Sequence, residues 1–222
     1  MRSFYNRVYN KANKTLDKLL VSHRSKKINN TDFSIICNNC WAGFIYRRYG
    51  LPYLTPTVGV YLFPGDFLRL CADLKGYMEK ELEFIPYTES KYRELIEERN
   101  QTEAPIGRLG DVEIVFLHYK TKEEAEEKWK RRAARINYNN LIFKFSKMNG
   151  CTEQELKQFD QLDCNKKFCF VPPADAGKVS CAVPYKSANG QDEINNDTSE
   201  YARYINVEKL INSRYANGLN MR

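Results

Sequence analysis

The residue with the clearest chemical potential is His118. It is one of two histidines in the 222 residues, and the other, His23, lies in a basic N-terminal segment. Because histidine changes its charge near neutral pH, a histidine at the end of a predicted strand is a candidate general base. Tyr119 and Lys120 follow it directly and could contact a bound group. A lone histidine at a strand end is also a common structural residue, and this alternative stays open.

A second group of chemically versatile residues is Cys37-Asn38-Asn39-Cys40, which follows a short apolar run. The Asn38 and Asn39 carboxamides, with the amides of a helix that begins near Trp41, could bind a carboxylate, phosphate or sugar oxygen. The alternative is that both side chains only cap the helix and form the turn. Cys40 is a candidate nucleophile because a thiol at a helix start can have a lowered pKa, although spacing assigns it no base.

The spacing of Cys37 and Cys40 also raises the question of a redox or zinc site. A second pair of zinc ligands would have to come from Cys164 and Cys169, which are separated by four residues and accompanied by no histidine. We therefore expect no metal site and no cofactor. All seven cysteines are expected to be reduced thiols, because their number is odd and they are spread over a mid-sized chain without a secretion signal.

Cationic groups that could neutralise a phosphate or carboxylate lie on the helix predicted over residues 122–136. Ala125 and Trp129 belong to its apolar stripe, and Arg132 and Arg135 lie alongside that stripe. The guanidinium fork matches phosphate geometry, so these two arginines are candidate substrate-binding residues. The alternative is that they are solvated surface charges.

The elements that must position these side chains alternate between short apolar strands and amphipathic helices. The strands that matter most are expected over residues 33–37, 112–119, 140–145 and 167–171. This alternation predicts an α/β protein with a mostly parallel or mixed sheet and helices on both faces, in a Rossmann-like three-layer architecture. In such sheets ligands bind outside the carboxyl ends of the strands. Asn38, Asn39 and His118 are therefore predicted to surround one cleft.

Charge is distributed unevenly along the chain. The first 27 residues hold eight of the 35 Lys and Arg residues and one of the 28 acidic residues, so the body is balanced. This balance argues against nucleic acid as a partner. Residues 4–21 have the periodicity of a basic amphipathic helix, which either packs on the body or adheres to an anionic membrane surface. We predict residues 1–30 as this helix and a linker, and residues 31–222 as one α/β domain with a long loop near residues 172–200.

The sequence lacks the signature motifs of several classes of protein. It contains no G-x-G-x-x-G, G-x-x-x-x-G-K-[ST], G-x-S-x-G or H-E-x-x-H, the signatures of nucleotide cradles, serine hydrolases and zincins. It also lacks an apolar run long enough to cross a membrane and an apolar N-terminal signal. We therefore expect a cytoplasmic protein, with the N-terminal helix as a candidate contact with the inner face of the membrane.

Two long stretches resemble a bacterial family of uncharacterised proteins often labelled exopolysaccharide biosynthesis protein: "SIICNNCWAGFIYRRYGLPYLTPTVGVYLFPGDFLRLCADLKGYM" and "PIGRLGDVEIVFLHYKTKEEAEEKWKRRAARINYNNLIFKF". The resemblance covers roughly residues 30–175. It implies a cytoplasmic role in building surface polysaccharide, and it brings no established reaction or catalytic residues. Where family members often have CWGG, this chain has Cys40-Trp41-Ala42-Gly43, a change that affects how closely a ligand can approach the backbone.

Two functions from different classes fit these residues. The first is a transferase that acts on a glycan, sugar phosphate or nucleotide sugar. In it Asn38 and Asn39 orient the substrate, His118 is the general base, and Arg132 or Arg135 neutralises an anionic group. The second is a non-catalytic saccharide-binding or scaffold protein of a polysaccharide synthesis complex. Three or more of these polar groups around one pocket would favour the enzyme, and their dispersal would favour the second function.

Overall fold

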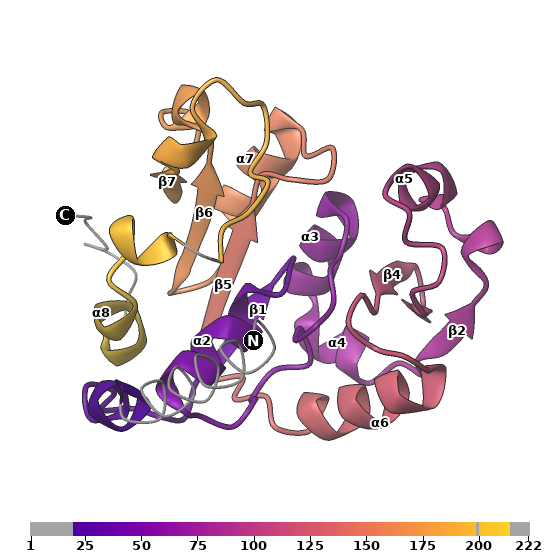
Figure 1. Cartoon of the computed structure of the whole chain (residues 1–222), viewed down its shortest axis with the longest axis horizontal. Coiled ribbons are helices and arrows are strands. Elements are labelled where there is room, and N and C mark those ends of the chain that lie inside the picture. Colours follow the sequence, from indigo (N-terminus) through magenta and orange to yellow (C-terminus); the bar gives the residue numbers. More distant parts are fainter. Residues whose placement is uncertain (1–19, 199, 214–222) are drawn as a thin grey trace, which may run out of the picture.

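The main sheet is parallel and has four strands. The computed structural model describes residues 20–198 and 200–213. Its main sheet joins, in spatial order, β1 (Ser34–Cys37), β5 (Leu141–Ser146), β6 (Lys167–Val171) and β7 (Ala182–Pro184), with every neighbouring pair parallel (Figure 1). The strands predicted near residues 33–37, 140–145 and 167–171 are confirmed. They read as apolar runs because both of their faces are buried.

A second, smaller sheet is antiparallel and has three strands. Its order is β2 (Glu83–Ile85), β3 (Ile106–Leu109) and β4 (Val112–Val115). β3 and β4 form a hairpin in which Gly110 adopts φ 61°, a left-handed conformation that favours glycine. The prediction of a strand over residues 112–119 in the parallel sheet is wrong, because only residues 112–115 form a strand and they pair with β3. His118 therefore does not follow a strand of the parallel sheet.

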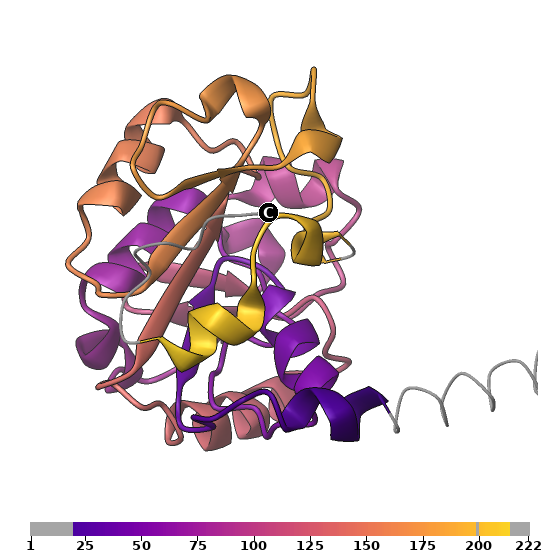
Figure 2. The same ribbon diagram turned by 90° about the vertical axis from the view of Figure 1, so that its left-hand side faces the viewer.

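One face of the parallel sheet is covered by α2 (Trp41–Tyr49) and α8 (Val207–Asn212), which lie side by side (Figures 1 and 2). Phe168 and Phe170 of β6 project to this face. They meet the Trp41 ring edge-on, with centroids 5.6 and 6.4 Å apart. This contact fixes the first turn of α2, and with it the turn after β1, against the sheet.

The opposite face is covered by helices that continue towards the small sheet: α3 (Pro64–Ala72), α4 (Leu74–Met78), α6 (Lys122–Ala133) and α7 (Glu153–Gln161). Phe67 of α3 and Phe159 of α7 pack against Phe145 of β5, with ring centroids 5.5 and 5.1 Å from it. Apolar residues of β3 and β4 belong to the same cluster, so the two sheets share one core. Helices on both faces of the parallel sheet are therefore observed, as the sequence predicts.

The helix predicted over residues 122–136 is present as α6, and its cap is a hydrogen bond at its first turn. The Thr121 hydroxyl accepts the N–H of Glu124 at 3.2 Å, and the Glu124 carboxylate accepts the N–H of Lys120. At α7, Thr152 and Glu155 form a reciprocal capping box, with distances of 2.8 and 3.2 Å. Polar caps thus set both helix starts.

Three other segments contain only short regular elements. A 3₁₀ turn (Tyr87–Glu89) and the short helix α5 (Arg93–Glu98) are the regular structure near residues 88–103. The long loop expected near residues 172–200 contains β7 and 3₁₀ turns at Pro173–Asp175 and Lys186–Ala188. The C-terminal segment has a 3₁₀ turn (Tyr201–Arg203) before α8.

Residues 54–62 run along the outer edge of β1 and connect the two sheets. On one side the N–H of Leu62 donates to the carbonyl of Asn38 at 3.0 Å. On the other side Tyr61 and Val115 exchange two backbone hydrogen bonds of 2.9 Å each. The segment therefore holds β4 beside the turn that follows β1.

Residues 20–25 are helical, at the end of the helix predicted for the N-terminal segment. The rest of the amphipathic pattern over residues 4–21 lies outside the described residues. Ile28 is buried in the cluster beneath α2 and α8. Asn212 ties this segment to α8, because its carboxamide accepts the N–H of Asn29 at 2.8 Å and donates to the carbonyl of Lys27 at 2.7 Å.

The fold is therefore of the α/β class, with a four-stranded parallel sheet and a separate antiparallel one. The parallel strands follow one another across the sheet without the reversal of order that marks a Rossmann fold. The expected Rossmann-like three-layer architecture is not confirmed. Within the described chain, no helix has the length and apolar character needed to cross a membrane.

Candidate functional site

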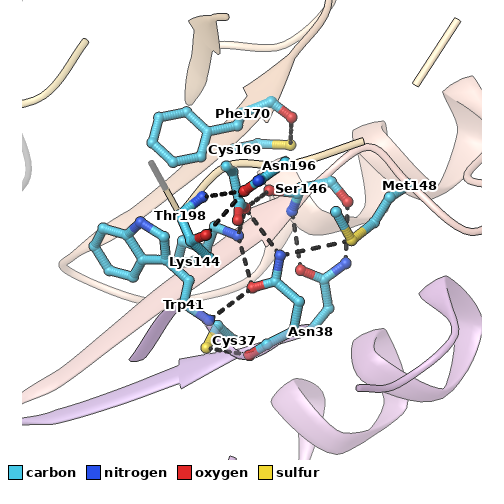
Figure 3. Close-up of polar contacts among 12 residues, drawn as sticks. Cys37, Asn38, Trp41, Lys144, Ser146, Met148, Cys169, Phe170, Asn196 and Thr198 are labelled. Atoms are coloured by element: carbon cyan, nitrogen blue, oxygen red, sulfur yellow. Dashed lines mark hydrogen bonds and ion pairs between the residues drawn. The ribbon is translucent and has the colours of Figure 1, made fainter. Parts of the chain in front are cut away.

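Asn38 holds the turn after β1 to β5. Its Nδ2 donates to the carbonyl of Ser146 at 3.0 Å, and its Oδ1 accepts the N–H of the same residue at 3.0 Å (Figure 3). The side chain of Asn38 is fully buried. The carboxamide thus extends the β1–β5 pairing beyond Cys37 and Lys144, the last residues in register.

Next to Asn38, a buried ion pair joins β5 to the loop before α8. Lys144 forms it with Asp197, and the Lys144 ammonium also donates to Asn39 Oδ1 at 3.0 Å. The Asp197 carboxylate further accepts from Asn39 Nδ2 at 2.9 Å and from Ser146 Oγ at 2.5 Å. The exposed fractions of Lys144 and Asp197 are 0% and 1%. We call Asn38, Asn39, Lys144, Ser146 and Asp197 the carboxyl-edge clasp.

The charges of the clasp compensate each other. Burial acts to raise the pKa of Asp197, but the Lys144 ammonium and hydrogen bonds from Lys144, Ser146 and Asn39 outweigh it. The pKa of Asp197 is therefore held below its usual value. The ammonium also lies 5.9 Å from the centroid of the Trp41 ring, where the aromatic face favours a cation.

Both clasp asparagines have their carboxamides engaged by the protein itself. Besides Lys144, Asn39 Oδ1 accepts the N–H of Trp41 at 3.1 Å, at the first residue of α2. Asn38 and Asn39 therefore form the turn and support the helix start, which is the structural alternative considered from the sequence. A ligand that used these carboxamides would have to replace their present protein partners.

Four other predicted residues converge on the backbone of residues 58–60. The hydroxyl of Tyr119 and Nη1 of Arg132 both donate to the carbonyl of residue 58, at 2.5 and 3.3 Å. The N–H of His118 donates to the carbonyl of residue 59 at 3.0 Å. The Cys40 thiol lies 3.6 Å from the carbonyl of residue 60. These side chains gather around a filled segment of chain.

Exposure separates these four residues. Arg132 is buried, donates to the Tyr119 hydroxyl and lies 4.9 Å from the ring centroid of Tyr53. His118 is exposed. Burial first, and then the neighbouring Cys37 and Asp197, raise the pKa of the Cys40 thiol to about 12. A thiol with that pKa is protonated at neutral pH, which works against the predicted nucleophilic role.

The structure places the eight predicted site residues in different surroundings. Asn38 and Asn39 lie in the clasp, and Lys120 and Arg135 are exposed. None of the eight lines either of the two large pockets described below. The parallel strand expected before His118 is absent, because β4 belongs to the antiparallel sheet.

The thiols are unpaired, and the first of them is structural. All seven cysteines are free. Cys37 is buried, accepts the N–H of Ala42 at 3.3 Å, and has a pKa raised by burial. Over residues 20–198 and 200–213, no three His, Cys, Asp or Glu side chains gather as metal ligands would.

A polar pocket of about 630 Å³ lies at the opposite, amino end of the parallel sheet. Its lining comes from the residues just before β1, β5 and β6 and from the end of α8. Six of these residues are asparagines: Asn30, Asn137, Asn139, Asn140, Asn165 and Asn212. We call it the asparagine pocket.

Some of these asparagines build the pocket, and others leave their amides available. Asn137 and Asn140 donate through Nδ2 to the carbonyl of Asp32, at 3.2 and 2.8 Å, and so connect the turns before β5 and β1. Asn139 and Asn165 are exposed, and their carboxamides form no hydrogen bond with any described residue. Each offers a donor and an acceptor to a ligand.

The electrostatic character of the pocket is neutral to acidic. Asp32 and Asp163 line it, are exposed, and form no ion pair within the described chain. Lys166 is buried, donates to the carbonyl of Ser213 at 3.1 Å, and has a pKa lowered by burial. Tyr138, with 40% of its surface exposed, adds an aromatic ring to the lining.

Reasoning from the sequence missed this pocket because the rule for parallel sheets directs attention to the carboxyl ends of strands. A signal was available in the run Asn137-Tyr138-Asn139-Asn140, immediately before a predicted strand. A turn before a strand needs only one or two asparagines to form. The additional carboxamide in this run therefore indicates side chains that are available to a ligand.

The geometry defines an α/β protein with a buried clasp at one edge of its parallel sheet and a polar pocket at the other. Residues 11–219 match the family described as a domain of unknown function, DUF1919, and the chain belongs to that family. An uncharacterised protein of Haemophilus influenzae is 34% identical over 146 residues. That match covers 66% of this chain and 65% of the relative, which is less than two thirds of the relative's length.

Proposed function

We propose that this protein binds a neutral glycan in the asparagine pocket and acts in surface polysaccharide biosynthesis on the cytoplasmic side of the membrane. The observation that carries the proposal is the pocket itself, in which six asparagines and one exposed tyrosine converge. Carboxamides pair with sugar hydroxyls because each can donate and accept at once. A tyrosine face can pack against the apolar face of a sugar ring.

The charges of the pocket favour a neutral ligand over a phosphorylated one. Asp32 and Asp163 have no described cationic partner, so an anion would meet two carboxylates. Lys166 donates inward to the carbonyl of Ser213 and is buried. Of the ligands considered from the sequence, a glycan therefore fits better than a sugar phosphate or a nucleotide sugar.

The hydrogen bonds that the predicted site residues form within the protein support a binding protein. The clasp occupies the carboxamides of Asn38 and Asn39, and the Arg132 guanidinium is engaged by Tyr119 and the chain near residue 58. These groups would have to leave their present partners to orient a substrate. The non-catalytic alternative stated from the sequence needs no such rearrangement.

Calorimetric titration with neutral mono- and disaccharides tests the proposal. Replacing both Asn139 and Asn165 by alanine should weaken binding by about tenfold or more, because each lost hydrogen bond contributes about 0.5–1.5 kcal/mol. Asn189→Ala is the matched control, since Asn189 is exposed and lies outside the pocket. Unchanged affinity in the double variant, or no binding of any neutral saccharide by the wild-type chain, would contradict the proposal.

A transferase with His118 as general base is the second candidate, and one observation favours it. His118 is exposed while its backbone is fixed to residue 59, so its imidazole is accessible on a rigid support. In that case His118→Ala should abolish sugar transfer while leaving saccharide affinity at the asparagine pocket intact. Saccharide binding without any transfer to an acceptor would contradict the transferase and support the binding function.

A further inference from the structure

A second pocket, of about 610 Å³, lies between the end of α2 and residues 201–209. Four cationic side chains line it against a single carboxylate, that of Glu208: Lys27, Arg48, Arg203 and Lys209. We call it the basic pocket. Its charge is opposite in sign to that of the asparagine pocket. Residues 27–30 connect the two pockets, and Asn212 holds this segment through two hydrogen bonds.

The uncompensated charge of the basic pocket resides on Arg48 and Lys27. Neither side chain forms an ion pair with a residue in the described part of the chain, whereas Arg203 is paired with Glu200 at 2.7 Å. The Arg48 guanidinium is half-buried and lies 5.9 Å from the ring centroid of Tyr201. It is therefore held beside the pocket wall with donors to spare.

Two tyrosines of the wall have charged neighbours of both signs. Burial raises the pKa of Tyr201, while Arg48 and Arg24 act to lower it and Glu208 acts to raise it, so Arg24 also lies near this wall. The one carboxylate, Glu208, is engaged by the hydroxyl of Tyr49, whose pKa is raised by burial and then by that contact. An anion entering the pocket would thus meet cations that the protein has not neutralised.

We propose that the basic pocket binds the phosphate group of an organic phosphate. A guanidinium fork and an ammonium are the groups that proteins use for phosphate, and the buried rings of Tyr49, Tyr201 and Tyr204 provide a wall for the organic part. Either a soluble sugar phosphate or a phospholipid headgroup has this chemistry. Lys27, which lines the pocket, ends the basic segment of residues 1–27, and the eight Lys and Arg residues of that segment favour the approach of either phosphate.

The neighbouring Arg47 allows a matched test. Arg47 and Arg48 both lie in the last turn of α2, where cations complement the helix dipole, but Arg47 is exposed over the Phe44 ring and lies outside the pocket. Arg48→Gln and Arg47→Gln therefore remove the same charge from the same helix end. If the basic pocket binds phosphate, Arg48→Gln should weaken phosphate binding and Arg47→Gln should not.

Three probes are applied to the full chain: inorganic phosphate, glucose 1-phosphate, and vesicles of phosphatidylglycerol compared with phosphatidylcholine. We expect Arg48→Gln to weaken binding of at least one phosphate probe about tenfold or more, with Arg47→Gln close to wild type. Binding of glucose 1-phosphate identifies a soluble phosphate, and binding of phosphatidylglycerol vesicles alone identifies a headgroup. Lys27→Gln, at an exposed residue, provides a second variant if Arg48→Gln does not fold.

Two results would overturn the phosphate site. The first is no binding of any of the three probes by the wild-type chain. The second is an equal loss in Arg47→Gln and Arg48→Gln, which would assign the attraction to net charge alone. Neither result bears on the neutral-glycan proposal, whose probes are uncharged and whose variants lie in the other pocket.

Discussion

Replacing Asp197 by alanine removes the carboxylate that compensates the fully buried ammonium of Lys144. The carboxylate accepts hydrogen bonds from Lys144, Ser146 and Asn39, and all four side chains are buried. Leaving one partner of such a pair uncompensated costs about 3–5 kcal/mol. Because domains are stable by only about 5–15 kcal/mol, we expect urea unfolding of Asp197→Ala at a much lower midpoint.

The same variant should change how stability depends on pH. The pKa of Asp197 is lowered in the folded protein, whereas an unfolded aspartate has a pKa of about 3.9. Its contribution is therefore complete above the unfolded value and is lost as the pH falls through the folded pKa. We expect the stability difference between wild type and Asp197→Ala to shrink steadily as the pH is lowered below about 4.

A double-mutant cycle shows whether the pair acts as a unit. Lys144→Met alone leaves a buried carboxylate, and Asp197→Ala alone leaves a buried ammonium, but the double variant leaves neither charge. We therefore expect the free energy of unfolding to fall less in the double variant than the sum of its decreases in the two single variants. Asp163→Ala is the control, because an exposed, unpaired aspartate should change the free energy of unfolding by about 0.5 kcal/mol or less. A loss below about 1 kcal/mol in Asp197→Ala, or strict additivity, would refute the coupled pair.

Two further outcomes follow from the segment around residues 58–60. Gly59→Ala should cost about 1–3 kcal/mol in urea unfolding, because Gly59 has φ 75° and an added Cβ would lie 3.1 Å from Cε2 of Tyr119. Gly177→Ala, with no atom near the added carbon, should be neutral, and equal losses in the two would argue against this account. With a pKa of about 12, Cys40 should react with iodoacetamide at pH 8 about a thousandfold more slowly than a free cysteine. Site-resolved mass spectrometry measures this rate, and labelling of Cys40 as fast as the unfolded chain would contradict it.

Local signals in the sequence predicted much of the parallel sheet. β6 has the bounds that the sequence predicts, and α6 begins at residue 122 as predicted. The hairpin of β3 and β4 was not predicted as such, because Ile106–Leu109 carries a glycine and an arginine and lacks a clear strand pattern. Without β3, the sequence pattern assigns the strand beginning at Val112 to the wrong sheet.

The clasp and the pockets were beyond prediction for a different reason. Lys144 lies within an apolar strand, and lysines are seldom fully buried, so nothing local marks it as part of an ion pair. Its partner Asp197 is 53 residues away in a segment that reads as loop. The asparagine pocket likewise combines turns that precede three different strands. Such sites depend on which strands become neighbours, and periodicity does not specify that.

The covering of β1 by residues 54–62 bears on how this protein resists self-association. β1 is an outer strand of the parallel sheet, and its free edge is occupied: the N–H of Cys37 donates to Thr57 Oγ1 at 3.3 Å. At the other edge β7 has three residues and ends in Pro184, which has no N–H to offer. Neither edge presents a long row of unpaired backbone groups, so the sheet is protected against growing by addition of strands from other molecules.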